Sequence, residues 1–241
     1  MANDKTHRKV KKPQISARYL ADYMAASHKV ARSIVRNCKY QSTARVIQHN
    51  LAKAAVSRFI RSGGEDVAVL LDTANMLRNR MTDSDFERDL LDHNADYIEQ
   101  VANVSAGLVL PDAEILAPGK FPAINLGGVK VTTEIFFRLR RLTKTNKIRV
   151  GIGTLRYAKG KALPAAVGVW QSAFLFGYLN VVNTEEEAEP EHKLCVTVDG
   201  YSGMVYPAPT DSIRRYQNME AACEAIAERW PNIAPPPNAV F

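Results

Sequence analysis

The spacing of apolar residues changes once along this chain of 241 residues, and the change separates two kinds of structure. Up to about residue 104 the apolar residues recur every three or four positions, the period of a helix with one buried face. Over residues 129–140 they alternate with polar residues, the period of a strand. The sequence therefore predicts an α+β or α/β fold, with a helical N-terminal half followed by a small mixed β-sheet flanked by helices.

The two periods also predict the individual elements. Five helices are expected in the first half, beginning at Ser16, Ser27, Thr43, Asp66 and Ser84. The second half reads strand, strand, helix, strand, strand, helix, at 129–140, 148–157, 164–179, 194–198, 204–206 and 211–230. Gly151 and Gly153 in the second strand indicate a bulge or the close approach of a neighbouring backbone.

Proline, glycine and charge set the expected boundaries. We predict a basic disordered arm at 1–13, a helical domain at 14–109, a linker at 110–122, an α/β domain at 123–233 and a Pro-rich tail at 234–241. The most apolar stretch, 162–182, is interrupted by polar residues and proline, so no membrane span is expected. Without a signal-peptide pattern, and with three scattered cysteines, the expected location is the cytoplasm.

Charge alternates in blocks along the chain. Residues 1–61 carry a net charge of +12, residues 62–119 carry −9, residues 120–180 carry +10 and residues 181–241 carry −6. Such blocks can pair with each other inside the fold, and a basic helix face is commonly only a solvated one. Uncompensated basic surface, however, concentrates polyanions such as nucleic acid. The predicted nucleic-acid-binding residues are Lys29, Arg32, Arg36, Arg45, Arg138, Arg140, Arg141, Lys144 and Lys147.

The first two predicted helices meet around Ala26 and Ser27 and have the dimensions of a helix-turn-helix. His28, Lys29, Arg32 and Arg36 would lie on the exposed side of its second helix, where they can meet phosphates or guanine edges. Short amphipathic helix pairs are common, and this turn lacks the glycine often found there. General attraction of phosphate by the whole block is therefore the broader expectation.

No complete catalytic signature occurs in the sequence. There is no GxSxG elbow, phosphate-binding loop or dinucleotide fingerprint, and the histidines and cysteines lack metal-ligand spacing. We therefore expect no cofactor and no bound metal. The leading hypothesis is a non-catalytic bacterial protein that acts on DNA or on DNA-associated machinery.

The order of strands and helices over about residues 125–230 resembles the core of the PD-(D/E)XK nucleases. The resemblance implies a metal-dependent nuclease, with Glu134 and Asp199 as acidic residues and Lys159 near the attacked phosphate. The second strand carries no acid to complete such a site, because none occurs between Glu134 and Glu185. Capping of the following turn also explains Asp199.

A short peptide offers a different hypothesis. The segment QSAFLF, with Gln171, Phe174 and Phe176, resembles peptides that bacterial proteins insert into the replication sliding clamp, and QHNLA, with Gln48 and Leu51, fits the pattern less well. The alternative places the apolar residues of the first segment on the inner face of a helix.

Longer stretches of the sequence resemble one family of toxins. The segments ISARYLADYMAASHKVARSIVRNCKY, KLCVTVDGYSGMVY and AACEAIAERWP are similar to the SocB-like bacterial toxins. That resemblance implies a non-enzymatic toxin that blocks the replication sliding clamp and needs an antitoxin protein as the adaptor for its proteolysis.

Overall fold

The computed structural model describes residues 5–44, 47–182, 185, 187–237 and 239–241. Its helices are α1 (Ala17–Ala25), α2 (His28–Lys39), α3 (Asn50–Arg61), α4 (Val67–Asn79), α5 (Asp85–Val104), α6 (Ala165–Val182) and α7 (Ser212–Arg229), with single 3-10 turns η1 (Ser105–Gly107), η2 (His192–Leu194) and η3 (Trp230–Asn232). Its strands are β1 (His7–Lys9), β2 (Gln14–Ser16), β3 (Tyr40–Ser42), β4 (Glu114–Leu116), β5 (Ile124–Leu126), β6 (Val129–Thr132), β7 (Phe137–Leu142), β8 (Ile148–Arg156), β9 (Ala188–Pro190), β10 (Val196–Asp199) and β11 (Val205–Pro207).

A mixed sheet forms the centre of the molecule, in the order β11-β10-β8-β7-β4, with β9 paired to the start of β8. Strands β7 and β8 form an antiparallel hairpin, and β8 runs parallel to β10. Helix α6 lies between these parallel strands in the chain, as the crossover of a parallel pair requires. The predicted mixed α+β fold is therefore confirmed.

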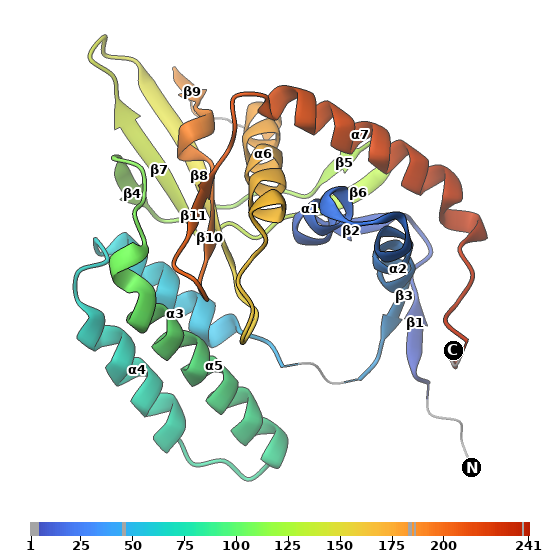
Figure 1. Cartoon of the computed structure of the whole chain (residues 1–241), viewed down its shortest axis with the longest axis horizontal. Coiled ribbons are helices and arrows are strands. Elements are labelled where there is room, and N and C mark those ends of the chain that lie inside the picture. Colours follow the sequence, from blue (N-terminus) through green and yellow to red (C-terminus); the bar gives the residue numbers. More distant parts are fainter. Residues whose placement is uncertain (1–4, 45–46, 183–184, 186, 238) are drawn as a thin grey trace.

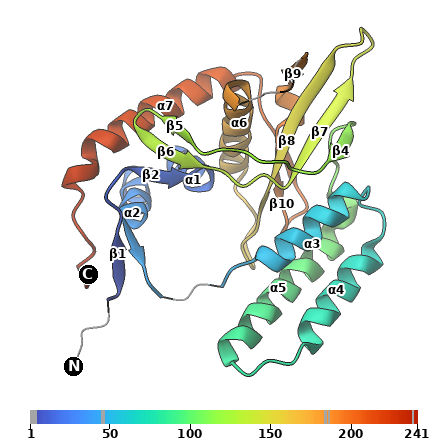
Figure 2. The ribbon, with the colours of Figure 1, turned by 180° about the vertical axis from the view of Figure 1, so that it is seen from behind.

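Helices cover both faces of this sheet (Figures 1 and 2). On one face, Phe174 and Leu175 of α6 share a buried cluster with Val150 and Ile152 of β8. On the other face, helices α3 and α5 share a second cluster with β7, β10 and the end of β8. Each strand of the central sheet can be apolar on both sides, as β8 is, because both sides are covered.

The helices of the first half are divided between these two faces, instead of forming one separate helical domain over 14–109. Helix α1 packs against α6, and β2 pairs in parallel with β6 in a second, three-stranded sheet, β2-β6-β5. Only α3, α4 and α5 form the helical layer on the other face. The periodicity of a helix shows that one side is buried, but it does not show which partner buries it.

The strand expected over 129–140 is two strands in different sheets. Val129 and Val131 of β6 face the first buried cluster, whereas Phe137 and Leu139 of β7 face the second. Residues 133–136 cross from one sheet to the other. The alternation of apolar residues continues through the crossing because both strands have one buried face, so the period alone could not locate the break.

The start of α3 also differs from the sequence prediction, Asn50 instead of Thr43. The buried side chain of Asn94 in α5 explains the difference. Its Oδ1 atom accepts a hydrogen bond from the backbone N–H of Ala52 at 2.9 Å, and its Nδ2 atom donates to the carbonyl of Gln48 at 2.9 Å. A side chain distant in sequence therefore caps this helix.

The arm and the tail, expected to be disordered or irregular, lie side by side where the structure describes them. Strand β1 pairs with β3, and the backbone N–H groups of Thr6 and His7 both lie 3.0 Å from the carbonyl oxygen of Val240. Phe241 packs on the ring of Tyr40, with the ring centroids 5.4 Å apart. The two ends of the chain thus hold each other against the body of the protein.

Helix α6 is long and apolar enough to cross a membrane by length and composition alone. Within the fold, 56% of it is buried, and it contacts α1, α7, β8 and β10. Its apolar character is accounted for by its position as the core helix of one face.

Candidate nucleic-acid interface

The second basic block is largely neutralised by the protein's own acids. The ion pairs are Arg138–Glu185, Arg140–Glu114, Arg141–Glu191, Lys147–Glu189 and Arg149–Glu189. Four of these five cations pair with residues 185–191, which β9 aligns beside β8. Of the predicted binding residues in this block, only Lys144 has no ion-pair partner within the described part of the chain. Electrostatic attraction from this block is therefore weakened.

The first basic block keeps its charge. Residues 5–61 contain thirteen Lys and Arg side chains in the described positions, and Lys53 alone among them forms an ion pair there, with Glu134 at 2.6 Å. The one described acid of this block, Asp22, pairs instead with Arg156 of the second block at 2.7 Å. Arg45, also predicted to bind nucleic acid, lies outside the described residues. Among the described residues, the positive charge without an acidic partner is thus concentrated before residue 62.

Helix α2 carries the predicted cluster of this block. Ala31, Val35 and Cys38 are buried on its inner side. Lys29 and Arg32 are exposed on the other side, and Arg36 is half-buried, one turn further along. The Arg36 Nε atom is buried and has no hydrogen-bond partner among the described residues. The amphipathic pattern of this helix was predicted from the sequence, and the structure leaves these side chains free of acidic partners in the described chain.

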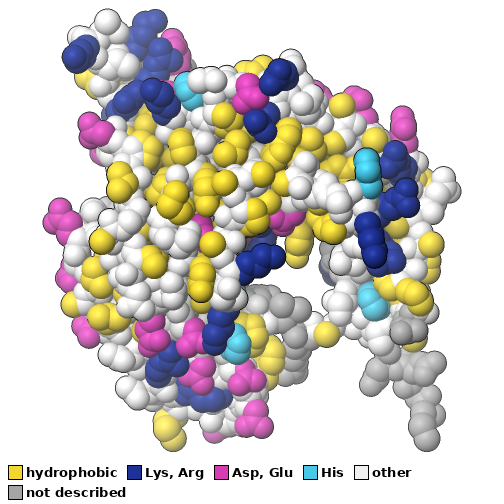
Figure 3. All heavy atoms as spheres, viewed as in Figure 1, with side chains coloured by type: hydrophobic (Ala, Val, Ile, Leu, Met, Phe, Trp, Pro, Cys, Tyr) yellow, Lys and Arg dark blue, Asp and Glu magenta, His cyan; other side chains and the backbone are white. Residues whose placement is uncertain are grey.

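A hollow lies between the helices α1 and α2 and the helical layer of α3 to α5 (Figure 3). A cavity of about 460 Å³ lies beside α1 and α2, lined by Arg18 on α1 and by Lys161 after β8. Arg156, which also lines the cavity, is buried and donates to Gln171 at 2.8 Å and to Asp22 at 2.7 Å. Burial lowers the pKa of Arg156, and the nearby Asp22 carboxylate opposes that shift. Arg156 is thus a structural cation, while Arg18 and Lys161 are exposed.

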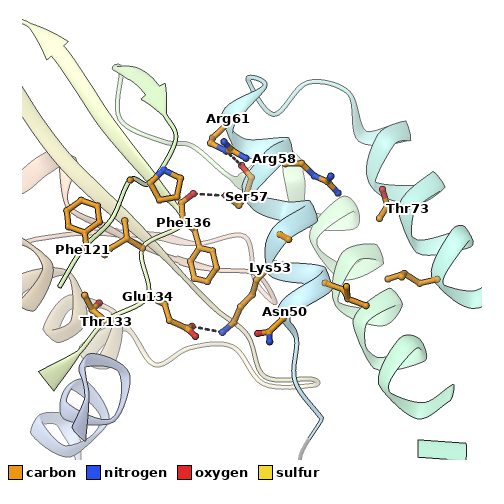
Figure 4. A pocket seen from close by; sticks show the side chains of 16 residues that line it. Asn50, Lys53, Ser57, Arg58, Arg61, Thr73, Phe121, Thr133, Glu134 and Phe136 are labelled. Carbon is orange, nitrogen blue, oxygen red and sulfur yellow. Dashed lines mark hydrogen bonds and ion pairs between the residues drawn. The ribbon is translucent and has the colours of Figure 1, made fainter. Parts of the chain in front are cut away.

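A larger groove, of about 760 Å³, lies over α3 and is called here the α3 groove (Figure 4). Helix α3 forms its floor, Thr73 and Leu77 of α4 border one side, and residues 118–121 and 133–136 border the other. The cations Lys53, Arg58 and Arg61 line it. The sequence predicts the Lys and Arg of residues 5–61 as a basic surface in general, but these three are not among the binding residues named individually, although Arg58 belongs to the solvent-exposed stripe of an amphipathic helix inside that block.

The residues of the nuclease hypothesis do not meet in one site. Glu134 lies in the crossing between β6 and β7 and pairs with Lys53, and Lys159 pairs with Asp96 at 2.5 Å. The carboxylate of Asp199 is buried and accepts hydrogen bonds from the backbone of Leu163 and Tyr201 and from the Ser202 hydroxyl. Within the described chain, no group of three or more His, Cys, Asp or Glu side chains is placed to hold a metal ion.

The two peptide candidates differ in accessibility. Gln171 and Phe174 are 3% and 0% exposed, and Phe176 is half-buried in the same helix. The folded chain therefore cannot insert Gln171 and Phe174 into a partner. Gln48 is exposed, and Leu51, 41% exposed, lies at the start of α3.

Comparison with known proteins identifies no relative of this chain. The chain matches no protein-family model, and a search of curated proteins finds no significant match. Function is therefore inferred from the geometry and charge described above.

Proposed function

We propose that the protein binds nucleic acid in the cytoplasm through the basic surface of residues 5–61, without catalysing a reaction on it. The exposed residues Lys29 and Arg32 of α2 are central to this surface, and Arg18 extends it over α1. The cavity lined by Arg18 and Lys161 lies beside these helices. Phosphate contacts by such side chains supply affinity without reading a base sequence.

One observation carries this proposal: the first basic block lacks the compensation that the second one has. Both blocks are rich in Lys and Arg in the sequence, with fourteen in residues 1–61 and eleven in residues 120–180. Glu185, Glu189 and Glu191 pair with the second block, whereas Lys53 is the only described cation of the first block that forms an ion pair in the described chain. Unpaired surface cations attract a polyanion and release its counterions on binding.

The test is a titration of labelled DNA and RNA over a series of salt concentrations. The double variant Lys29→Ala/Arg32→Ala removes two unpaired cations. The matched control Arg140→Ala/Lys147→Ala also removes two cations, one half-buried and one exposed, but both of these are paired with glutamates. We expect the first variant to weaken binding and to reduce the slope of log K against log salt by about 1 to 2, because each lost phosphate contact changes it by roughly 0.7 to 0.9.

Two results would contradict the proposal. A wild-type affinity that does not change with salt excludes direct phosphate contact. Equal loss of affinity in the two double variants shows that total charge matters and that the surface of residues 5–61 has no special part in binding.

A further inference from the structure

The exposed stripe of α3 gives the α3 groove its depth. Asn50, Ala54 and Arg58 follow one another at intervals of four residues on the solvent side of this helix, and all three are exposed. Ala54, in the middle, presents only a methyl group. The larger polar side chains of Asn50 and Arg58, both labelled in Figure 4, precede and follow it along the helix.

The groove has an excess of positive charge. Lys53, Arg58 and Arg61 line it, and the single acid of its lining, Glu134, bonds to Lys53 at 2.6 Å. The Nε atom of Arg61 donates to the carbonyl of Ser57 at 3.2 Å, but neither Arg61 nor Arg58 forms an ion pair with any described residue. Two guanidinium groups therefore remain to contact anionic groups of a ligand.

Aromatic and hydroxyl groups are also part of the lining. The Nζ atom of Lys53 lies 5.5 Å from the ring centroid of Phe136, so this ring is already occupied by a cation. Phe121 is half-buried, packs against Tyr178 with the ring centroids 6.1 Å apart, and borders the groove. The hydroxyl of Thr133 is buried in the lining without a hydrogen-bond partner among the described residues, although buried polar groups are normally paired.

From these features we infer that the α3 groove binds a single-stranded segment of nucleic acid. A base stacks on Phe121, and the phosphates of the strand contact Arg58 and Arg61. Stacking on an aromatic side chain needs an unpaired base, because the faces of paired bases are covered by their neighbours in a duplex. The volume of about 760 Å³ is that of a small-ligand site, so it holds about one or two nucleotides and excludes a duplex.

This inference rests on the proposed nucleic-acid binding and adds the form of nucleic acid that the groove selects. Binding of duplex by the surface of α2 requires no groove, because phosphates are accessible on the outside of a duplex. The two ideas can therefore fail separately.

The experiment measures the fluorescence anisotropy of a labelled oligothymidylate and of a labelled duplex of equal length with the full-length protein. Ala54→Glu fills the centre of the groove with a carboxylate at an exposed helical position. Ala221→Glu makes the same change at an exposed position of α7, on the far side of the molecule, and is the matched control (Figure 2). Phe121→Leu removes the ring and keeps an apolar side chain against Tyr178. Thermal melting of each variant confirms that it is folded.

We expect Ala54→Glu to weaken single-strand binding at least about tenfold and Phe121→Leu to weaken it at least about fivefold, the lower end of the range for a lost base stack. Duplex binding should change less than twofold in both, and Ala221→Glu should match the wild type for both probes. Equal single-strand affinities of Ala54→Glu and Ala221→Glu would overturn the groove as a binding site, while retained duplex binding would leave the proposed function standing.

Two further outcomes distinguish the proposed nucleic-acid binding from the inference about the α3 groove. If the wild type binds neither probe, the proposed function fails and the groove inference fails with it. If polyglutamate of the same charge displaces the oligothymidylate as well as unlabelled oligothymidylate does, the groove recognises charge alone and base stacking is excluded.

Discussion

The Nζ atom of Lys39, at the end of α2, lies 2.5 Å from the carbonyl oxygen of Trp230, just beyond the end of α7. The same ammonium group donates to the carbonyls of Pro231 at 3.1 Å and Ile233 at 3.0 Å. Lys39 is 3% exposed, so this cation of the first basic block has a structural role and is not accessible to a ligand. It satisfies carbonyl groups that the end of a helix leaves without partners.

Replacing Lys39 with methionine is expected to lower the free energy of unfolding by about 1.5 to 3 kcal/mol, because hydrogen bonds to a charged donor are lost and buried carbonyls remain unpaired. Urea unfolding measures this change. Lys29→Met, at an exposed position of the same helix, is the control and should change stability by less than about 0.5 kcal/mol. Similar free energies of unfolding for both variants would show that the Lys39 contacts make no net contribution to stability.

Much of the fold follows from local patterns, but the partners of each element do not. Ser16 was predicted to cap the first helix, and its hydroxyl accepts a hydrogen bond from the backbone N–H of Tyr19 at 3.3 Å. The strand from Ile148 was also predicted, and it is the central strand β8. The break after Thr132 and the cap from Asn94 depend on contacts between segments distant in sequence, which a local period does not encode.

The candidate site was only partly predictable for a related reason. Composition shows where cations are dense, but it does not show which of them meet acids in the fold. Arg141 and Arg32 belong to blocks of similar composition, yet Arg141 pairs with Glu191 and Arg32 has no acidic partner in the described chain. The α3 groove also requires residues 118–121 and 133–136 to lie beside α3, an arrangement that only the tertiary structure brings about.

His49 makes stability depend on pH. Its ring packs edge-on against Tyr97 and Tyr157, and its Nδ1 atom is buried without a partner in the described chain. Burial lowers the pKa of His49, and positive charge on His93, Lys53 and Arg18 lowers it further. The unfolded state therefore binds more protons below about pH 6.5, so stability is lost as the pH falls from that value towards the folded pKa.

Urea unfolding between pH 7.5 and pH 5 tests this expectation for His49. His49→Phe keeps an aromatic ring and removes the titration, so its stability should fall less over that interval than the wild type's. Burial opposes ionisation of Asp96, but hydrogen bonds from Lys159 and Arg78 lower its pKa overall, and a hydrogen bond from Arg215 lowers the pKa of Asp211. The contributions of both carboxylates to stability are lost at more acidic pH. Parallel pH profiles for the two proteins would exclude His49 as the cause.

Gly151 is expected to be intolerant of a side chain. A Cβ atom there would lie 2.1 Å from the carbonyl oxygen of Leu194, so a neighbouring backbone does approach this glycine closely, one of the two predictions for its position. Gly151→Ala should destabilise the protein by about 1 to 3 kcal/mol or more, because the strand or its neighbour must shift. Gly107→Ala, where the nearest backbone atom would be 4.0 Å away, is the matched control, and equal thermal unfolding temperatures would contradict the expectation.

Substitution of Gln171 tests whether this residue stabilises the fold or binds a partner as part of a peptide. Its Oε1 atom accepts a hydrogen bond from the buried Arg156, so Gln171→Ala leaves a charged donor short of one partner and should cost about 1 to 3 kcal/mol of stability. Gln48→Ala, at an exposed position, should cost less than about 0.5 kcal/mol. In a pull-down with a bacterial sliding clamp at a temperature where both variants are folded, Gln171→Ala should behave as the wild type does. Loss of capture in that variant alone would mean that α6 leaves the core to bind the clamp.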